Sequence, residues 1–232
     1  MIKGIQKTTV IDYPDKIACT LFLGGCNFRC GFCYNSDIVL NPAKMDDIPE
    51  IEVLEMLKER KKFLDGVCIT GGEPTIHPKL GNFLSKVKEL GYDVKLDTNG
   101  TKPEVLRELI AGKLVDYIAM DVKAGLLSYD KVTQTIVDKE KIKESIDLIK
   151  QSGVDYEFRT TVVPDIIDEE EIESIGELVK GAKRFFLQQF RNDKNTLSAR
   201  YSKKESISKE RIEKFKEMME RYVDEVKIRN LK

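Results

Sequence analysis

The sequence predicts an α/β fold in which a mostly parallel sheet curves into a partial barrel of six strand–helix units. Short apolar runs alternate with amphipathic stretches along most of the 232 residues. Such alternation is typical of parallel strands joined by right-handed helical crossovers. Six units are two fewer than a closed eight-stranded barrel contains. No repeat of fixed period and no low-complexity segment interrupts the pattern.

Within residues 2–25 we expect a strand, a turn from Asp12 to Asp15, and a second, buried strand, because Pro14 and the flanking aspartates supply turn chemistry. Residues 49–63 carry apolar side chains at helical spacing and predict a helix. The later strands are expected near residues 66–70, 93–97, 115–120, 155–163 and 184–189. The later helices are expected near residues 78–90, 103–111, 139–151, 168–180 and 208–224.

The chain is expected to form one domain over residues 1–232. It would comprise an N-terminal strand or hairpin (1–16), the barrel (17–190) and a C-terminal loop and helix (191–232). Residues 191–206 are polar and lack a periodic apolar face, which predicts a loop leaving the sixth barrel strand on the active-site side. The apolar stripe of the last helix predicts core packing.

Composition excludes several classes of partner. A hydrophobic content of 41% is enough for a sizeable core. The net charge of −1 gives no general attraction to nucleic acid or to an anionic membrane. No run approaches 18 apolar residues, and the N-terminus lacks the apolar core of a signal peptide. We therefore expect a cytoplasmic protein with no nucleic-acid or membrane partner.

Three cysteines, Cys26, Cys30 and Cys33, lie within eight residues after a strand-like apolar run. In a reducing compartment such a cluster indicates metal binding or redox chemistry, and thiolates are the ligands that zinc and iron–sulfur clusters prefer. A cubane cluster usually takes four cysteines, so three would leave one iron open. The alternative is a three-cysteine zinc site completed by the only histidine, His77.

The two remaining cysteines, Cys19 and Cys68, lie in apolar runs and are expected to be buried as small hydrophobic residues. They leave no cysteines for an auxiliary cluster. His77 follows a glycine pair and precedes Pro78, a position more typical of helix entry than of catalysis.

Polar motifs follow the expected strands, at the end where ligands bind in parallel α/β folds. In Gly71-Gly72-Glu73-Pro74 the glycines allow close backbone approach, and the carbonyl and carboxylate oxygens could accept hydrogen bonds from an ammonium group. Asp97 with Thr98, and Met120 with Asp121 and Lys123, place oxygen donors suited to a hard cation after the next two strands. Alternatively, Asp121 and Lys123 form an ion pair.

The expected strand at 155–163 alternates so that Glu157, Arg159 and Thr161 share one face. A charged pair there is costly unless it pairs or contacts a ligand. Arg159 is therefore expected either to reach a bound ligand or to pair with Glu157. Gln188 and Gln189 end the following strand, and one of them is expected to face the site.

The Cys-x3-Cys-x2-Cys spacing, with Phe32 before the third cysteine, resembles the signature of the radical S-adenosylmethionine (SAM) enzymes. The resemblance implies a partial (β/α)6 TIM-like barrel and a [4Fe-4S] cluster whose open iron binds SAM. It further implies that one electron splits SAM into methionine and a 5′-deoxyadenosyl radical. By the same resemblance, Gly71, Gly72 and Glu73 hold the SAM amino group, and Phe32 and Asn35 contact the cofactor. Gln188, from its place at the end of its strand, is expected to approach the ribose.

The downstream motifs resemble those of glycyl-radical-enzyme activases, including the group that serves anaerobic ribonucleotide reductase. The resemblance implies that Asp97, Thr98, Met120 and Asp121 bind a monovalent cation, Na⁺ or K⁺, that touches the SAM carboxylate. Lys123 and Arg159 would approach SAM. It also implies a protein substrate that receives a glycyl radical, and the low potential of such clusters indicates ferredoxin or flavodoxin as electron donor.

The sequence departs from the activases at two places. They commonly have tyrosine before the third cysteine and histidine after it, where this chain has Phe32 and Tyr34. Three hypotheses therefore stand: a glycyl-radical-enzyme activase, a radical SAM enzyme acting on a small molecule or another peptide, and a non-catalytic zinc-binding interaction module.

Overall fold

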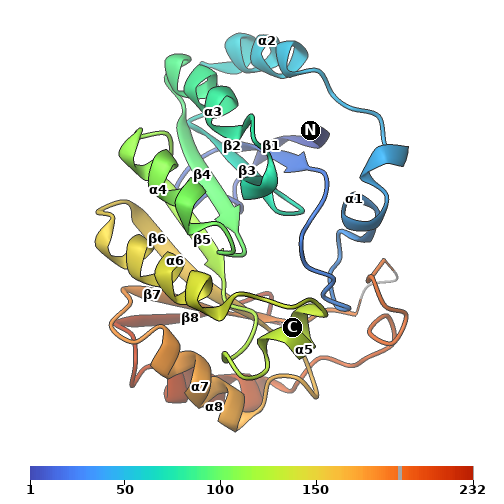
Figure 1. Ribbon diagram of the computed structural model, residues 1–232, viewed down its shortest axis with the longest axis vertical. Helices are drawn as coiled ribbons and strands as arrows, with labels where there is room; N and C mark the ends of the chain where they lie inside the picture. Colours follow the sequence, from blue (N-terminus) through green and yellow to red (C-terminus); the bar gives the residue numbers. More distant parts are fainter. Residues whose placement is uncertain (193–194, 232) are drawn as a thin grey trace. The chain divides into compact units, whose positions relative to one another are not determined.

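The computed structural model describes residues 1–192 and 195–231 (Figure 1). The strands in these residues are β1 (Ile2–Thr9), β2 (Ala18–Leu23), β3 (Gly66–Gly71), β4 (Asp93–Thr98), β5 (Tyr117–Asp121), β6 (Asp155–Val162), β7 (Arg184–Gln189) and β8 (Glu225–Arg229). The α-helices are α1 (Ser36–Leu40), α2 (Glu50–Arg60), α3 (Leu80–Glu89), α4 (Pro103–Ala111), α5 (Tyr129–Thr133), α6 (Lys139–Gln151), α7 (Glu169–Leu178) and α8 (Lys209–Met219). Two short 3-10 helices are η1 (Pro42–Lys44) and η2 (Pro74–Ile76).

The strands follow one another in chain order, from β1 to β8. β1 is antiparallel to β2, whereas β2 with β3, β3 with β4, β6 with β7, and β7 with β8 are parallel. In the described part of the chain β1 and β8 are the edges of this order, so the sheet is not closed. The predicted α/β fold with an open, mostly parallel sheet is confirmed.

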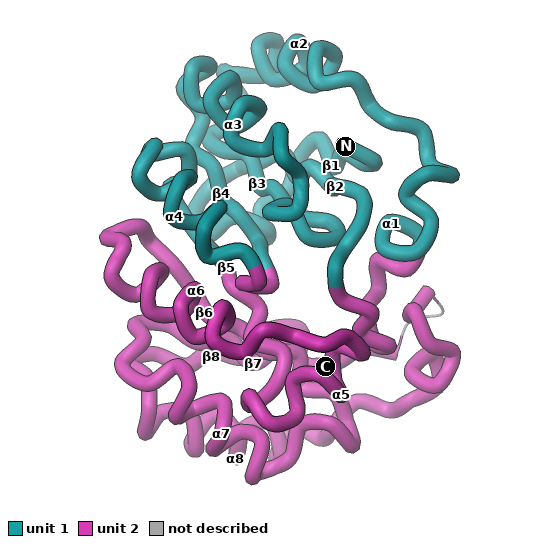
Figure 2. Tube along the Cα trace, in the orientation of Figure 1, with its two compact units in different colours: residues 1–27, 37–98, 102–118 teal, residues 28–36, 99–101, 119–232 magenta. Residues whose placement is uncertain are grey.

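The chain divides into two compact units, coloured separately in Figure 2. Unit 1 comprises residues 1–27, 37–98 and 102–118. Its parallel strands keep a regular register, with Ala18 opposite Gly66 and Gly66 opposite Asp93. Helix α3 forms because its apolar side chains recur every three or four residues, and this face is buried. The buried residues of that face are Leu80, Phe83, Leu84 and Val87.

Unit 2 comprises residues 28–36, 99–101 and 119–232. Its helices α6, α7 and α8 each begin with a side-chain cap, supplied by Asp138, Asp168 and Ser208. Figure 1 shows α7 and α8 side by side. Among the largest fully buried side chains of this unit are Phe158, Phe185 and Phe190. The predicted single domain over 1–232 stays a prediction.

The main difference from the expected elements lies after α8. The sequence predicts a helix to residue 224, but α8 ends at Met219 and a further strand, β8, follows. The Tyr222 carbonyl accepts a hydrogen bond from Gly181 N, and β8 then pairs in parallel with β7. In β8 only Val226 is buried, so its five residues resemble a polar tail in the sequence.

No helix in residues 1–192 and 195–231 is long and apolar enough to cross a membrane.

Candidate active site around the cysteine loop

In unit 1 the end of β3 packs directly on the start of the cysteine loop. Gly72 N donates to the Leu23 carbonyl and Glu73 N to the Gly25 carbonyl, both over 2.8 Å. Gly71 has φ +114°, and a Cβ on Gly72 would lie only 1.8 Å from the Gly25 oxygen. The glycine pair is therefore required for the approach of two backbone segments, a role that the sequence does not reveal.

The Glu73 carboxylate is buried, with 1% of the residue exposed. Its Oε1 atom accepts hydrogen bonds from the backbone N and hydroxyl of Thr75 and, over 2.8 Å, from the Thr98 hydroxyl. Glu73 thus links η2 to the end of β4. Thr98, predicted as a cation ligand, directs its hydroxyl hydrogen to Glu73.

The second half of the cysteine loop belongs to unit 2. Cys30 and Phe32 are buried, with 6% and 5% exposure. Cys33 N donates to the Cys30 carbonyl over 3.0 Å, so a tight turn joins the two cysteines. Arg29 N donates to the Thr133 carbonyl over 2.8 Å, which attaches the loop to the end of α5.

A C-terminal segment also lies on this loop. Leu197 N donates to the Cys33 carbonyl over 3.0 Å and Ser198 N to the Gly31 carbonyl over 2.8 Å. The Tyr201 ring meets Phe32 edge-on at 6.1 Å, and a Cβ on Gly31 would lie 2.7 Å from Tyr201 Cε2. The sequence predicts a loop on this side of the fold, but nothing in it singles out these residues.

Tyr34, at the position where the activases commonly have histidine, contacts the end of β7. Its ring stacks on Phe190 with centroids 6.0 Å apart and an interplanar angle of 20°. Its hydroxyl oxygen accepts a hydrogen bond from Arg191 N over 2.7 Å. Tyr34 therefore joins the cysteine loop to the start of the C-terminal loop. Asn35 follows it, immediately before α1.

The predicted SAM residues Lys123 and Arg159 meet at Asp121 in unit 2. Arg159 donates to Asp121 through Nε (2.8 Å) and Nη2 (3.2 Å), and Lys123 Nζ lies 3.3 Å from the same carboxylate. Burial opposes the charge of Asp121, but the two cations prevail and hold the pKa of this carboxyl far below its usual range. The sequence left ion pairing and ligand binding open for these residues, and the structure shows the ion pairs.

The thiols of the cysteine loop also affect the pKa of Lys123. Burial disfavours the ammonium form, but Asp121 and, further, Cys30 and Cys33 stabilise it, so the pKa of Lys123 is raised. Met120 is fully buried, and a Cβ on Gly100 would lie 2.1 Å from its Cε atom.

In unit 1 Asp97 is paired with Lys95 of the same strand. The Lys95 ammonium also lies 3.8 Å from Cys68 Sγ and 6.0 Å from the centre of the Tyr117 ring. Asp97 and Asp121 thus each have a protein cation, and the monovalent-cation site stays a prediction. The predicted burial of Cys19 and Cys68 is confirmed, since neither is exposed. Burial raises the pKa of the Cys19 thiol to about 11.

Two features of β7 and β8 complete the site in unit 2. Gln189 Nε2 donates to the Ile207 carbonyl over 2.9 Å, whereas Gln188 pairs in register with Thr161 of β6 and Arg229 of β8. Arg229 forms a two-pronged ion pair with Glu157. Arg229 is not among the site residues that the sequence predicts, because the sequence does not predict β8.

His77 has a structural contact. Its Nε2 atom lies 2.8 Å from the Gly24 carbonyl oxygen, and burial lowers the pKa of the ring. Over the residues that the structure describes, no three or more His, Cys, Asp or Glu side chains are gathered closely enough to hold a metal ion. The ligand role of the three loop cysteines therefore rests on their spacing, their soft donor chemistry and the family described below.

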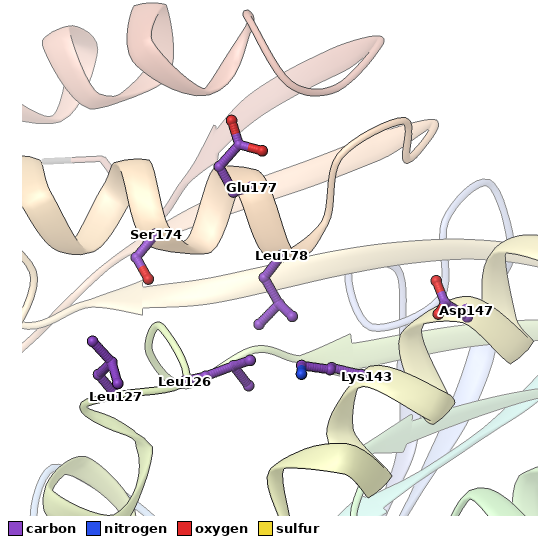
Figure 3. A pocket seen from close by; sticks show the side chains of 7 residues that line it. All are labelled: Leu126, Leu127, Lys143, Asp147, Ser174, Glu177 and Leu178. Carbon is purple, nitrogen blue, oxygen red and sulfur yellow. The ribbon is translucent and has the colours of Figure 1, made fainter.

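The structure also contains two hollows that the three loop cysteines do not line. One, of about 410 Å³, is lined in unit 2 by the loop after β5 and by α6 and α7, with Leu126, Leu178 and Lys143 among its side chains (Figure 3). The other, of about 790 Å³, lies in unit 1 between α3 and α4. His77, the candidate fourth ligand of the alternative zinc site, lines the hollow in unit 1, whereas none of the proposed cluster, SAM or cation residues lines either hollow.

Comparison with known proteins identifies the family. The model of the Radical SAM superfamily matches residues 20–180. A protein of Methanocaldococcus jannaschii, provisionally named a glycyl-radical enzyme activating enzyme, is 36% identical over 100% of this chain and 96% of its own. The 7-carboxy-7-deazaguanine synthase of Thermococcus kodakarensis is 29% identical over 64% of this chain and 55% of its own.

Among solved structures, Streptococcus suis SuiB bound to S-adenosylmethionine superimposes with a TM-score of 0.66 at 16% identity. The similarity covers 91% of this chain and 52% of SuiB, so the chain spans about half of that protein. At this identity the likeness concerns the fold alone.

The chain belongs to the radical SAM superfamily, and it is a radical SAM enzyme. Within that superfamily, the chain is similar over its whole length to the M. jannaschii protein that is provisionally named a glycyl-radical enzyme activating enzyme. The family implies a [4Fe-4S] cluster and SAM, and the residues fit them: three soft thiols occur in one loop, and two of these thiols, Cys30 and Cys33, favour the charged form of Lys123 and raise its pKa.

Proposed function

We propose that this enzyme activates a glycyl-radical enzyme. The observation that carries the proposal is the 36% identity to the M. jannaschii protein, which extends over all of this chain and nearly all of that one. A whole-length relationship indicates shared substrate-binding segments as well as a shared core. The Met120-Asp121-Val122-Lys123 and Arg159 motifs of the activases agree with it.

In this proposal Cys26, Cys30 and Cys33 hold the cluster and leave one iron for SAM. When bound, the cluster and SAM together supply a 5′-deoxyadenosyl radical that can abstract a hydrogen atom. The tight turn between Cys30 and Cys33, held by Leu197 N, fixes the spacing of two ligands. The buried Lys123 offsets negative charge on the thiolates.

The cofactor would be oriented by residues at the strand ends. The backbone of Gly71-Gly72-Glu73 would accept hydrogen bonds from the SAM ammonium, with Glu73 holding that segment through Thr75 and Thr98. Lys123 and Arg159 would bind the carboxylate end. Phe32 and Asn35 would contact the nucleoside, and Gln188 the ribose. A Na⁺ or K⁺ ion at Asp97, Thr98, Met120 and Asp121 belongs to the proposal as well.

The substrate would be a backbone glycine of a partner protein such as anaerobic ribonucleotide reductase, and the electron donor a ferredoxin or flavodoxin. We also propose that the protein works in the cytoplasm as a single domain, without nucleic-acid or membrane partners.

The test is anaerobic incubation of the reconstituted enzyme with SAM, a reductant and candidate glycyl-radical proteins. Electron paramagnetic resonance then reports which partner acquires a radical. A glycyl doublet on a partner, dependent on the three cysteines, is the expected result. SAM cleavage without any radical on these partners would contradict the activase assignment.

The similarity to 7-carboxy-7-deazaguanine synthase favours a second candidate, a radical SAM enzyme with a small-molecule substrate. The two differ in what stimulates SAM cleavage. An activase releases 5′-deoxyadenosine in proportion to its protein partner, whereas the second candidate needs only the small molecule.

A further inference from the structure

Arg229, in β8, forms a two-pronged ion pair with Glu157 in unit 2. Its Nη1 and Nη2 atoms donate to the two carboxylate oxygens of Glu157 over 2.5 and 2.8 Å. The guanidinium lies 3.5 Å from the centre of the Phe186 ring, so it crosses β7 to reach β6. The two-pronged geometry is the strongest form of arginine–carboxylate contact.

Glu157 needs this partner because its side chain is wholly buried. A buried carboxylate is costly unless a cation and hydrogen bonds compensate it. Besides Arg229, the ion pairs of the described residues include one further cation for Glu157, Arg159, whose Nη1 lies 3.9 Å from Oε1.

Arg159 is thus placed between two carboxylates. Its Nε and Nη2 atoms are committed to Asp121 at 2.8 and 3.2 Å, while its remaining amino group points toward Glu157. Lys123 pairs with Asp121 on the other side. The charges therefore alternate from Lys123 through Asp121, Arg159 and Glu157 to Arg229, and each carboxylate has two cations nearby.

We propose that Arg229 is a positioning residue that keeps Arg159 on Asp121 by satisfying Glu157, and so keeps Arg159 directed at the carboxylate end of bound SAM. This inference rests on the proposed function of Arg159. Without Arg229, the buried Glu157 draws Arg159 toward itself. Arg159 then moves away from Asp121 and Lys123, and the cofactor loses a charge-assisted hydrogen bond.

The experiment compares SAM binding by the reconstituted protein, measured by calorimetry, in four forms: wild type, Arg229→Met, Glu157→Gln and the double variant. Arg229→Met is expected to weaken binding about tenfold, the loss associated with one charge-assisted contact. The cluster, followed by iron content and visible absorbance, should be retained. Glu157→Gln and the double variant should bind within about threefold of wild type, because neither contains the carboxylate that competes for Arg159.

A matched control is available on the neighbouring strand. Arg184 of β7 pairs with Asp155, donates to the Tyr156 carbonyl over 3.0 Å, and has 27% side-chain exposure against 29% for Arg229. Arg184→Met removes an arginine of similar burial from the same unit without touching Arg159. It should leave SAM affinity unchanged, whatever it does to the melting temperature.

The outcomes separate the two proposals. If wild type binds no SAM, the proposed function is wrong and this inference is wrong with it. If wild type binds SAM and Arg229→Met binds equally well, only the inference is overturned. If Arg229→Met does not fold, the double variant decides: weak SAM binding there overturns the inference, because no carboxylate remains to displace Arg159.

Discussion

Gly72 lies against the backbone of Gly25 so closely that a single added methyl group would be placed 1.8 Å from the Gly25 carbonyl oxygen. This contact joins the end of β3 to the residue before Cys26. The geometry of the cysteine loop in unit 1 therefore depends on a glycine that is distant in sequence.

We expect Gly72→Ala to destabilise the protein by about 3 kcal/mol, because the clash is with backbone and forces one of the two segments to move. In a protein of this size the melting temperature should fall by about 6 °C or more. Thermal denaturation followed by circular dichroism measures the effect. Gly81→Ala in α3 is the control: its Cβ would meet only the side chains of Leu109 and Leu114, at ordinary distances of 3.8 and 3.9 Å. It should be neutral or stabilising by about 1 kcal/mol.

Replacement of Cys26, Cys30 or Cys33 by alanine should abolish SAM cleavage, because each removes a proposed cluster ligand. Release of 5′-deoxyadenosine under anaerobic reducing conditions is the measurement. Cys68→Ala is the matched control, since Cys68 is wholly buried in β3. That variant should retain cleavage. Full activity in any variant of the three loop cysteines would remove that cysteine from the ligand set.

The stabilisation that Asp121 gives to the folded protein should be lost at acidic pH. The pKa of its carboxyl is held below the ordinary value by Arg159 and Lys123, against the effect of burial. A lowered folded-state pKa stabilises the protein above the unfolded pKa of about 4, and this contribution is lost as pH falls below that value. Wild type should therefore exceed Asp121→Asn in melting temperature at pH 7. The difference should shrink progressively between pH 4 and pH 2.

The same carboxylate provides a test of the cofactor site. Asp121→Ala should weaken SAM binding by about tenfold or more, because Arg159 and Lys123 lose the anion that orients them. Iron content should stay at the wild-type level. Loss of iron instead would show that Asp121 supports the cluster, and it would contradict the proposed role at the cofactor and the monovalent cation.

Gly31→Ala should displace Tyr201, since its Cβ would lie 2.7 Å from Tyr201 Cε2. The expected result is a reduced yield of bound cluster on reconstitution, measured as iron and sulfide per chain. The double variant Gly31→Ala, Tyr201→Ala removes the clash and should recover most of the cluster. If the double variant stayed as defective as Gly31→Ala, the contact with Tyr201 would not be the cause.

The sequence allowed most of the barrel to be predicted, because α3 and α6 have buried faces at helical spacing and the parallel strands are apolar runs. It also allowed the residues of the cysteine loop and the strand ends to be named. Strand β8 could not be predicted, because its alternation of polar residues with Val226 and Ile228 is also that of an exposed tail. Pairing with β7, a tertiary contact, decides its conformation.

The sequence allowed the residues of the site to be named, but not the contacts between them. The sequence left an Asp121–Lys123 ion pair and an Arg159–Glu157 pair open, but a strand pattern does not indicate that Arg159 donates both of its short hydrogen bonds to Asp121. The contacts of Leu197, Ser198 and Tyr201 with the cysteine loop were not predicted, since the residues that make them lie far away in the sequence and belong to no recognised motif.

The contacts of Leu197 and Ser198 with the cysteine loop have a consequence for when, during protein synthesis, the cluster can be inserted. The carbonyls of Gly31 and Cys33 accept hydrogen bonds from Ser198 and Leu197, which leave the ribosome long after the three thiols have emerged. A nascent chain that ends before Leu197 exposes its thiols on a loop without these two donors. Iron loading is therefore expected to be most efficient once the chain has extended beyond Ser198, because only then are both donors present on the cysteine loop.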